Sequence, residues 1–164
     1  MPRPRLPKQK KDLGPDVPLV FYFAFKPEPA KRLRSRITKQ LKIQTWTPRE
    51  TVDYENEINK LALQQHLILE PFTARLELIL NFRFQGERHG DIDNVEKAIL
   101  DGFQPKYRDD KCTRPGVFRN DACVKKVHKE FFYDKQIESC VEVILRRHKS
   151  RPWSERLRSF EAKD

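Results

Sequence analysis

The sequence predicts a single α/β (α+β) domain built on a mixed β-sheet with two main helices. Apolar side chains recur at every second position between 74 and 84, as in a strand that buries one face. Two helical segments and three further strand-like segments accompany it in the order β, α, β, α, β, β. The 164 residues, 37% of them hydrophobic, supply one compact core and not two.

The N-terminal half is predicted to hold an arm, a strand, a loop and a helix. Residues 1–18 contain five prolines and five cations, a composition typical of a flexible basic arm. Aromatic and β-branched residues favour a strand over 19–25, and prolines among cations favour a loop over 26–43. Thr47 can cap a helix, Pro48 suits its first position, and Glu50 stands where a capping box requires an acid. A helix is therefore predicted from 48 to about 67.

The C-terminal half is predicted to contain the long strand, a second helix and two more strands. After the strand over 74–84, a polar turn over 85–90 leads to a helix that begins near Asp93 or Asn94 and stops at Gly102. Residues 104–116 read as a charged loop, and strands over 122–132 and 137–147 are expected to form a hairpin turning at 133–136. The folded domain is therefore expected over 19–147, followed by a basic tail over 148–164.

The charge balance favours a polyanionic partner. There are 34 Lys and Arg against 24 Asp and Glu, a net charge of +10, and the excess is concentrated in the first eleven residues, in 26–49 and in 146–164. Concentrated positive charge suits nucleic acid, because neutralised phosphates release counterions. The simpler alternative is a set of solvated basic segments.

Other features exclude membrane and disulfide-rich classes. The longest apolar run, Leu19–Phe25, has seven residues, far short of the roughly 20 that a spanning helix needs. Three isolated cysteines and four scattered histidines form no disulfide framework or zinc motif. We therefore expect a reduced, cytoplasmic protein.

Two carboxylates at a strand-to-helix junction are the best candidates for chemistry. Asp91 and Asp93 are two residues apart, so in extended backbone they converge on one point, where Asp121 from a neighbouring strand would complete a cluster. Such oxygen ligands suit Mg²⁺ or Mn²⁺ acting on a phosphodiester. Alternatively, the pair only caps a helix and faces its dipole. His89 is expected to be an exposed turn residue.

Two segments resemble motifs of the RusA family of Holliday-junction resolvases. Residues 90–101, Gly-Asp-Ile-Asp-Asn-Val-Glu-Lys-Ala-Ile-Leu-Asp, are similar to its central motif, Asp-x-Asp-Asn-x-x-Lys-Ala-x-x-Asp. Residues 120–124, Asn-Asp-Ala-Cys-Val, resemble its second motif, Asp-Asp-x-x-Val. Residues 27–31, the Arg-rich stretch after them, and 47–55 also resemble its N-terminal half, so the likeness covers roughly 19–147.

The resemblance implies a homodimeric, Mg²⁺-dependent endonuclease that resolves four-way DNA junctions by symmetric paired nicks. Carried over by motif position, the active site would contain Asp91, Asp93 and Asp121 as metal ligands together with Lys97. Asp101, four residues after Lys97, is expected to orient Lys97 or to cap a neighbouring backbone group. Asn120 replaces the first Asp of the second motif, and the segment 104–119 is longer than expected.

The nuclease prediction has two competitors: a non-catalytic protein that binds branched DNA, and a related nuclease acting on flaps or other branched DNA. The intact acidic set argues against a pure binder, since carboxylates facing phosphate gain it nothing. The candidates for DNA contact are the cations of the basic stretch, namely Lys31, Arg32, Arg34, Arg36 and Lys39.

Overall fold

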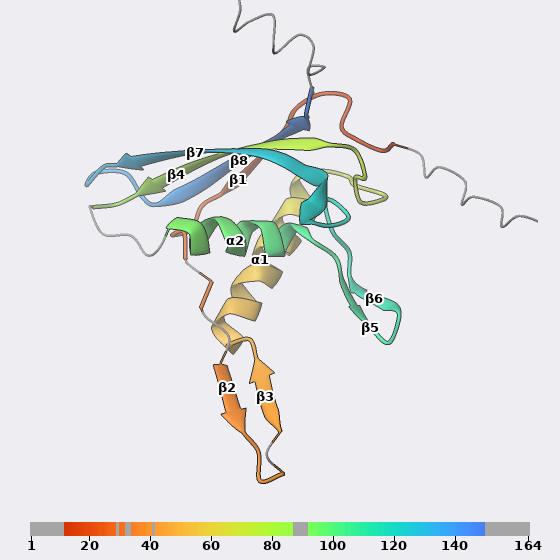
Figure 1. Cartoon of the computed structure of the whole chain (residues 1–164). Coiled ribbons are helices and arrows are strands. Elements are labelled where there is room, and N and C mark those ends of the chain that lie inside the picture. Colours follow the sequence, from red (N-terminus) through yellow and green to blue (C-terminus); the bar gives the residue numbers. More distant parts are fainter. Residues whose placement is uncertain (1–11, 29, 32–33, 41, 87–91, 150–164) are drawn as a thin grey trace, which may run out of the picture.

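The computed structural model describes residues 12–28, 30–31, 34–40, 42–86 and 92–149. Within these residues the main sheet has four strands, in the order β1 (Leu19–Phe23), β8 (Cys140–Arg147), β4 (Leu76–Phe84) and β7 (Val124–Tyr133). Helices α1 (Arg49–Gln65) and α2 (Ile92–Phe103) both lie against one face of this sheet (Figure 1). The predicted mixed α+β domain is confirmed.

Strand β4 forms the centre of the core. Its side chains at every second position are completely or almost completely buried, as the alternation predicted: Leu76, Leu78, Leu80, Phe82 and Phe84. They pack with residues from both helices, including Ile58 of α1 and Ile99 of α2. The opposite face of β4 is more polar, and there Asn81 donates a hydrogen bond to Glu142 of β8.

The predicted hairpin between the last two strands is wrong. Strands β7 and β8 both pair with β4, β7 in parallel and β8 antiparallel, so β4 lies between them. Alternation identifies a strand but not its partners, and the apolar β4 has a neighbour on each side. The parallel pair β4–β7 is joined through α2, as parallel strands require a long crossover. The starts of β4 and β7 and the end of β8 therefore meet at one end of the sheet.

Helix α1 begins one residue later than predicted. Pro48 is its N-cap, with an extended ψ of 142°, and its carbonyl accepts hydrogen bonds from the backbone of Thr51 and Val52. The capping prediction for Thr47 is therefore wrong, and the N-cap makes no side-chain hydrogen bond. Glu50 instead lies 3.5 Å from Lys31.

Both segments predicted as loops contribute to a short β-hairpin. Strand β2 (Arg34–Ile37), inside the first segment, pairs with β3 (Ile43–Trp46), which begins at the last residue of that segment. Strands β5 (Lys106–Arg108) and β6 (Lys111–Arg114) pair within the second segment. Every residue of β2 and β3 is exposed, so no buried face marks the pattern. The β5–β6 turn uses Asp109 and Asp110 with positive φ values of 48° and 60°, which Asp tolerates better than most residues.

Gly102 lies inside α2 and does not end it, contrary to the prediction. A Cβ at Gly102 would come within 2.7 Å of the Ile58 side chain, so the glycine allows α1 and α2 to approach closely. Asn59 of α1 stabilises this contact, because its side-chain amide donates hydrogen bonds to the backbone carbonyls of Gly102 (3.0 Å) and Pro115 (2.8 Å).

Residues 12–14, which the prediction included in the arm, are held against the sheet. Leu13 donates its backbone N–H to the Thr73 hydroxyl and accepts from the backbone of Thr73 and Ala74. Residues 15–18 of the predicted arm lead directly into β1. Residues 1–11 and 150–164 lie outside the described part.

The structure can be compared with the exclusion of disulfide-rich and membrane-spanning classes. All three cysteines, at 112, 123 and 140, are free. Among the described residues, no helix is long and apolar enough to span a membrane.

Candidate active site

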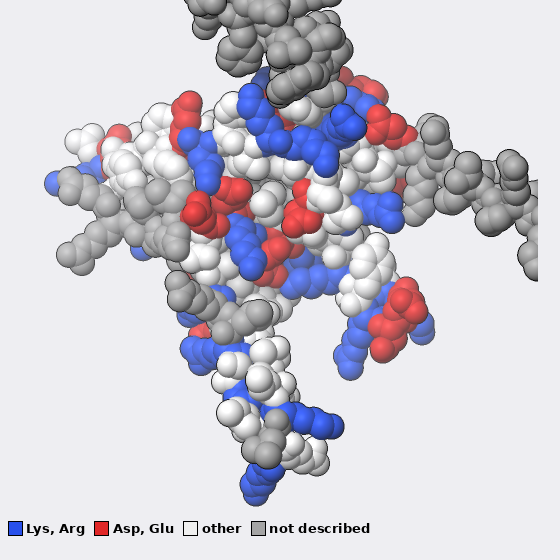
Figure 2. Space-filling model, viewed as in Figure 1, with Lys and Arg blue, Asp and Glu red and all other residues white. Residues whose placement is uncertain are grey.

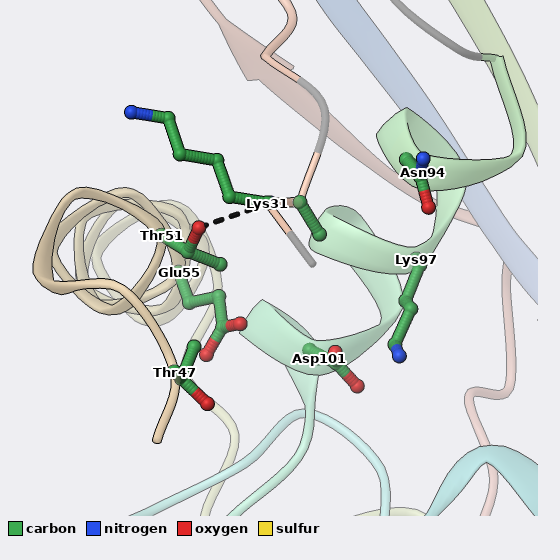
Figure 3. A pocket seen from close by; sticks show the side chains of 8 residues that line it. Lys31, Thr47, Thr51, Glu55, Asn94, Lys97 and Asp101 are labelled. Carbon is green, nitrogen blue, oxygen red and sulfur yellow. Dashed lines mark hydrogen bonds between the residues drawn. The ribbon is translucent and has the colours of Figure 1, made fainter. Parts of the chain in front are cut away.

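One face of helix α2 presents three charged side chains in a row. Asp93, Lys97 and Asp101 are spaced four residues apart, which places them on the same side of the helix, one turn from each other. Lys97 and Asp101 project from the helix to the same side in Figure 3. Asp93 is 88% exposed, whereas Asp101 lies partly under neighbouring elements.

A lysine from the sheet holds the first turn of α2. The ammonium of Lys129 lies 2.6 Å from Glu96 Oε2 and 3.2 Å from Asp93 Oδ1. Its hydrogen bonds to Glu96 and Asp93 raise the pKa of Lys129, so the lysine stays charged. Lys129 pairs in register with the buried Leu80, and it therefore points toward the helices.

Lys129 is not among the site residues predicted from the sequence, although its position in the strand pattern is unusual. Its β7 neighbours two positions away, Val127 and Phe131, are partly buried against the core. Lys129 therefore occupies a core-facing position, where a lysine is unusual unless it pairs with a carboxylate.

The far end of the row gathers more carboxylates. Burial, followed by the charge of Glu55, raises the pKa of Asp101, while Lys97 and Lys106 act in the opposite direction. Asp121 also raises this pKa, which places its charge within range of Asp101. Asp121 comes from the short 3-10 turn η1 (Asp121–Cys123) that precedes β7.

Glu55 is a buried carboxylate beside this group. It is 4% exposed, and Lys106 of β5 neutralises it through a 2.7 Å ion pair. Lys106 thus ties the β5–β6 hairpin to α1. The motifs gave no indication of either residue, because the contact depends on how α1 and this hairpin pack.

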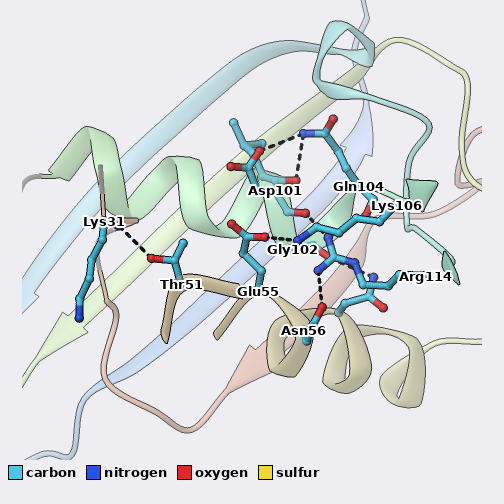
Figure 4. A network of polar contacts seen from close by, with 11 residues as sticks. Lys31, Thr51, Glu55, Asn56, Asp101, Gly102, Gln104, Lys106 and Arg114 are labelled. Atoms are coloured by element: carbon cyan, nitrogen blue, oxygen red, sulfur yellow. Dashed lines mark hydrogen bonds and ion pairs between the residues drawn. The ribbon is translucent and has the colours of Figure 1, made fainter. Parts of the chain in front are cut away.

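A buried arginine fixes the end of α2. Arg114 of β6 donates to the carbonyls of Asp101 and Gln104 and to Oδ1 of Asn56 (Figure 4). Burial lowers the pKa of Arg114, and the charges of Glu55 and Asp101 oppose that effect. An arginine at the C-terminal end of a helix satisfies carbonyls that have no partner within the helix.

A polar cavity of about 290 Å³ lies between α1, α2 and the segment before β2 (Figure 3). Its lining combines cations, carboxylates and small polar groups: Ala30, Lys31, Thr47, Thr51, Glu55, Asn94, Lys97 and Asp101. The Lys31 backbone donates to the Thr51 hydroxyl at 3.1 Å and fixes one wall. Lys97 and Asp101 therefore line a polar recess between the two helices.

A family model described as endodeoxyribonuclease RusA matches residues 24–146 of this chain. The match covers most of the chain and includes α2, η1 and the whole cavity lining. The chain belongs to the RusA family. Among curated proteins, the comparison found no match. Family membership makes the chain a nuclease of the Holliday-junction resolvase type, which acts on branched DNA.

Three of the four predicted site residues of this RusA-family chain can be located. Asp93, Lys97 and Asp121 are exposed, whereas Asp91 lies outside the described residues, as does His89. Asp93 is the second residue of α2. The charge of Asp121 acts instead on Asp101, which lies eight residues further along the helix, roughly 12 Å at 1.5 Å per residue. In the part of the chain that is described, no three His, Cys, Asp or Glu side chains form a metal-binding group. The shared metal site stays a prediction.

The predicted DNA-contacting cations lie on or next to the β2–β3 hairpin, which projects away from the sheet (Figure 1). Arg34 and Arg36 are on β2, Lys39 is in its turn, and Lys31 lines the cavity; Arg32 lies outside the described residues. The Arg36 guanidinium lies 5.9 Å from the Trp46 ring centroid. Arg36 Nε also donates to Gln44, so it is held on one side of the hairpin.

Proposed function

We propose that this chain is a Mg²⁺-dependent endonuclease that resolves four-way DNA junctions by symmetric paired nicks during recombination or repair. The observation that carries the proposal is the row of Asp93, Lys97 and Asp101 on α2, with Asp121 near its far end. These residues coincide with the motif positions of the family.

The donor chemistry fits a divalent metal. Asp93 and Asp121 are exposed carboxylates, and Asp91 precedes Asp93 by two residues in the sequence. Mg²⁺ and Mn²⁺ favour such oxygen ligands and keep open positions for phosphate oxygens. A metal held at Asp91 and Asp93 would supply Lewis-acid stabilisation of the phosphoryl group and a more acidic water. Asp121, whose charge acts at the other end of α2, would join these two ligands only if η1 and the first turn of α2 came closer together.

The neighbouring lysines have separate tasks in this proposal. Lys97 extends from α2 into the recess, where its ammonium stabilises negative charge on the scissile phosphate. Lys129 donates to both Glu96 and Asp93, so it orients the Asp93 carboxylate. Asp101, one turn beyond Lys97, orients the Lys97 ammonium through their opposite charges.

The β2–β3 hairpin is proposed to contact the DNA beside the cavity. Its described residues carry Arg34, Arg36, Lys39 and Lys42 and no acid. Cations bind phosphates, and the exposed Trp46 offers a ring on which an unpaired base can stack.

Paired nicks require two active sites. A four-way junction has two-fold symmetry, and one chain supplies one row of site residues, so a homodimer matches the substrate. Light scattering with junction DNA present should give two chains per complex. A monomer would remove symmetric resolution from the proposal and leave a simpler nuclease.

Cleavage of three labelled DNAs tests the proposed function. With Mg²⁺, a four-way junction should be cut at symmetry-related positions in two opposing strands, while duplex and flap DNA stay largely intact. Preferential cutting of the flap would favour the related-nuclease alternative. Binding of the junction without cleavage in Mg²⁺ or Mn²⁺ would favour a non-catalytic binder.

A further inference from the structure

Cations from distant parts of the sequence converge at one end of the sheet. Because β7 is parallel and β8 antiparallel to β4, residues at the starts of β4 and β7 and at the end of β8 become neighbours. Glu77, for example, pairs in register with both Lys126 and Arg146. We define the basic strip as the eight residues Arg75, Arg119, Lys125, Lys126, Arg146, Arg147, His148 and Lys149.

The basic strip is continuous along three adjoining hollows. The first, of about 290 Å³, includes Arg119, Lys125 and Arg75, together with Asn120 next to Asp121. Arg75 also lines the second, of about 430 Å³. That hollow shares Arg147 and His148 with the third, of about 570 Å³, which adds Lys126, Arg146 and Lys149. The strip therefore runs from the residue beside Asp121 around the end of the sheet.

Acids offset only part of this charge. The acids that line the hollows, among the described residues, are Asp12, Asp16 and Glu77. Glu77 pairs with Arg146 (3.1 Å) and Lys126 (3.8 Å), and Asp12 pairs with Arg147 (3.3 Å).

Four other cations of the basic strip remain available to a ligand. Within the described part of the chain, Arg75, Arg119, Lys125 and Lys149 form no ion pair, and all four are exposed. Figure 2 shows a group of Lys and Arg side chains at the upper edge of the molecule, above the end of β8, and Asp and Glu side chains below it, around α2.

The paired residues give the basic strip a fixed shape. Glu77 is buried, and it gathers Arg146, Lys126 and His128 around one carboxylate, with His128 Nε2 2.9 Å from its Oε1. Arg147 also donates to the backbone carbonyls of Asp12 and Gly14. A preorganised cationic surface loses less entropy on binding than free lysines do.

We infer that the basic strip binds the sugar–phosphate backbone of a DNA arm that leaves the active site past Asp121. This inference rests on the proposed function, because it takes the cut strand to lie at α2. A phosphate backbone fits better than a compact anion, since the cations are spread over three connected hollows.

A charge-matched pair of double variants tests the inference. Arg75→Gln with Lys125→Gln removes two cations of the basic strip that form no ion pair in the described part, and Lys60→Gln with Lys135→Gln removes two exposed cations elsewhere. Affinity for a long-armed junction is measured against salt concentration in EDTA. Removing one phosphate-binding cation should make the slope of log K against log salt shallower by ~0.9. For the strip variant, we expect this slope to become shallower by up to ~1.8 and binding at 0.1 M salt to weaken at least ~10-fold. The control variant should match the wild type in both measurements.

Arm length supplies the second measurement. Because the basic strip lies beyond the active site, DNA with shortened junction arms should no longer reach it, and wild type and strip variant should then bind equally. Equal salt slopes on long arms, or the same loss of affinity on short and long arms, would overturn the inference. Should the double variant melt early, the single Lys125→Gln variant must still shift the slope by ~0.9. Cleavage of the junction by the wild type tests the proposed function separately, because the wild type would still cleave the junction if the basic strip did not bind DNA.

Discussion

The face of helix α2 and the basic strip carry opposite charges on the same small domain. Around α2, carboxylates outnumber lysines, and Asp101 and Glu55 are partly or fully desolvated. On the strip, cations outnumber carboxylates, and several have no acidic partner among the described residues. Acids next to a phosphate weaken DNA binding, whereas cations strengthen it. On the proposed assignment, catalysis and affinity reside on separate surfaces, so substitutions should affect one without the other.

The largest expected effect comes from Asp93. Asp93→Asn removes a proposed metal ligand, and a loss of several kcal/mol of transition-state stabilisation slows cleavage by at least ~10³-fold. Junction affinity should survive or increase, because one negative charge near phosphate is gone. Single-turnover cleavage and a binding titration check this, with Asp53→Asn on α1 as the control. Wild-type cleavage by Asp93→Asn would remove the residue from the site.

Lys97 should give the next largest effect. Lys97→Ala is expected to slow single-turnover cleavage by about 10²-fold or more, as loss of a positioned donor does, while the melting temperature and junction affinity change little. Lys97→Arg keeps the charge but replaces a compact ammonium with a planar fork, and it should also be clearly impaired. An ordinary surface ion pair would tolerate both changes, so full activity of Lys97→Arg with only a few-fold loss in Lys97→Ala would contradict the assignment.

Deleting residues 1–11 should act on affinity alone. The deletion removes Arg3, Arg5, Lys8, Lys10 and Lys11, so junction binding should weaken. Its salt dependence should become shallower by ~0.9 for each of these cations that binds a phosphate. The cleavage rate at saturating protein should change far less than in the Asp93 variant. An unchanged salt slope would show that these cations stay in solvent.

The smallest effect concerns stability. Hydrogen bonds from Arg146 and then from His128 lower the pKa of the Glu77 carboxyl below its ordinary value of 4.5. A lowered pKa stabilises the fold above about pH 4.5, and this contribution is lost as the pH falls through the folded-state pKa. Glu77→Gln should cost about 1–3 kcal/mol at pH 7, and the difference from wild type should shrink toward pH 3. Urea titrations check this, and the exposed Glu70→Gln serves as the control; a pH-independent difference would contradict the ion-pair account.

The sequence predicted the core of the fold because burial leaves a readable pattern. The alternation through β4 and the helical spacing after Pro48 both follow from one buried face. The hairpins β2–β3 and β5–β6 were missed because they lie outside the core. A strand without a buried face shows no alternation of apolar and polar residues. The pairing of β7 and β8 with β4 was missed because alternation does not specify neighbours.

The site was predictable only where its residues are close in sequence. The two-residue spacing of Asp91 and Asp93 predicts an acidic pair, with Asp121 as a third carboxylate, and the motif resemblance adds Lys97. Glu55, Lys106, Arg114 and Lys129 come from other elements, and their contacts with the site depend on packing that spacing does not encode. Of these four residues, only Lys129 could have been suspected from the sequence, because it is a charged residue at a core-facing position of its strand.

The most direct test of the separation of binding from catalysis is to form the junction complex in EDTA and then add Mg²⁺. Bound and cleaved DNA are measured on the same sample. We expect the complex to form without metal, through the cationic surfaces, and paired nicks to appear only after Mg²⁺ is added. Cleavage in EDTA, or a complex that forms only with Mg²⁺, would contradict it.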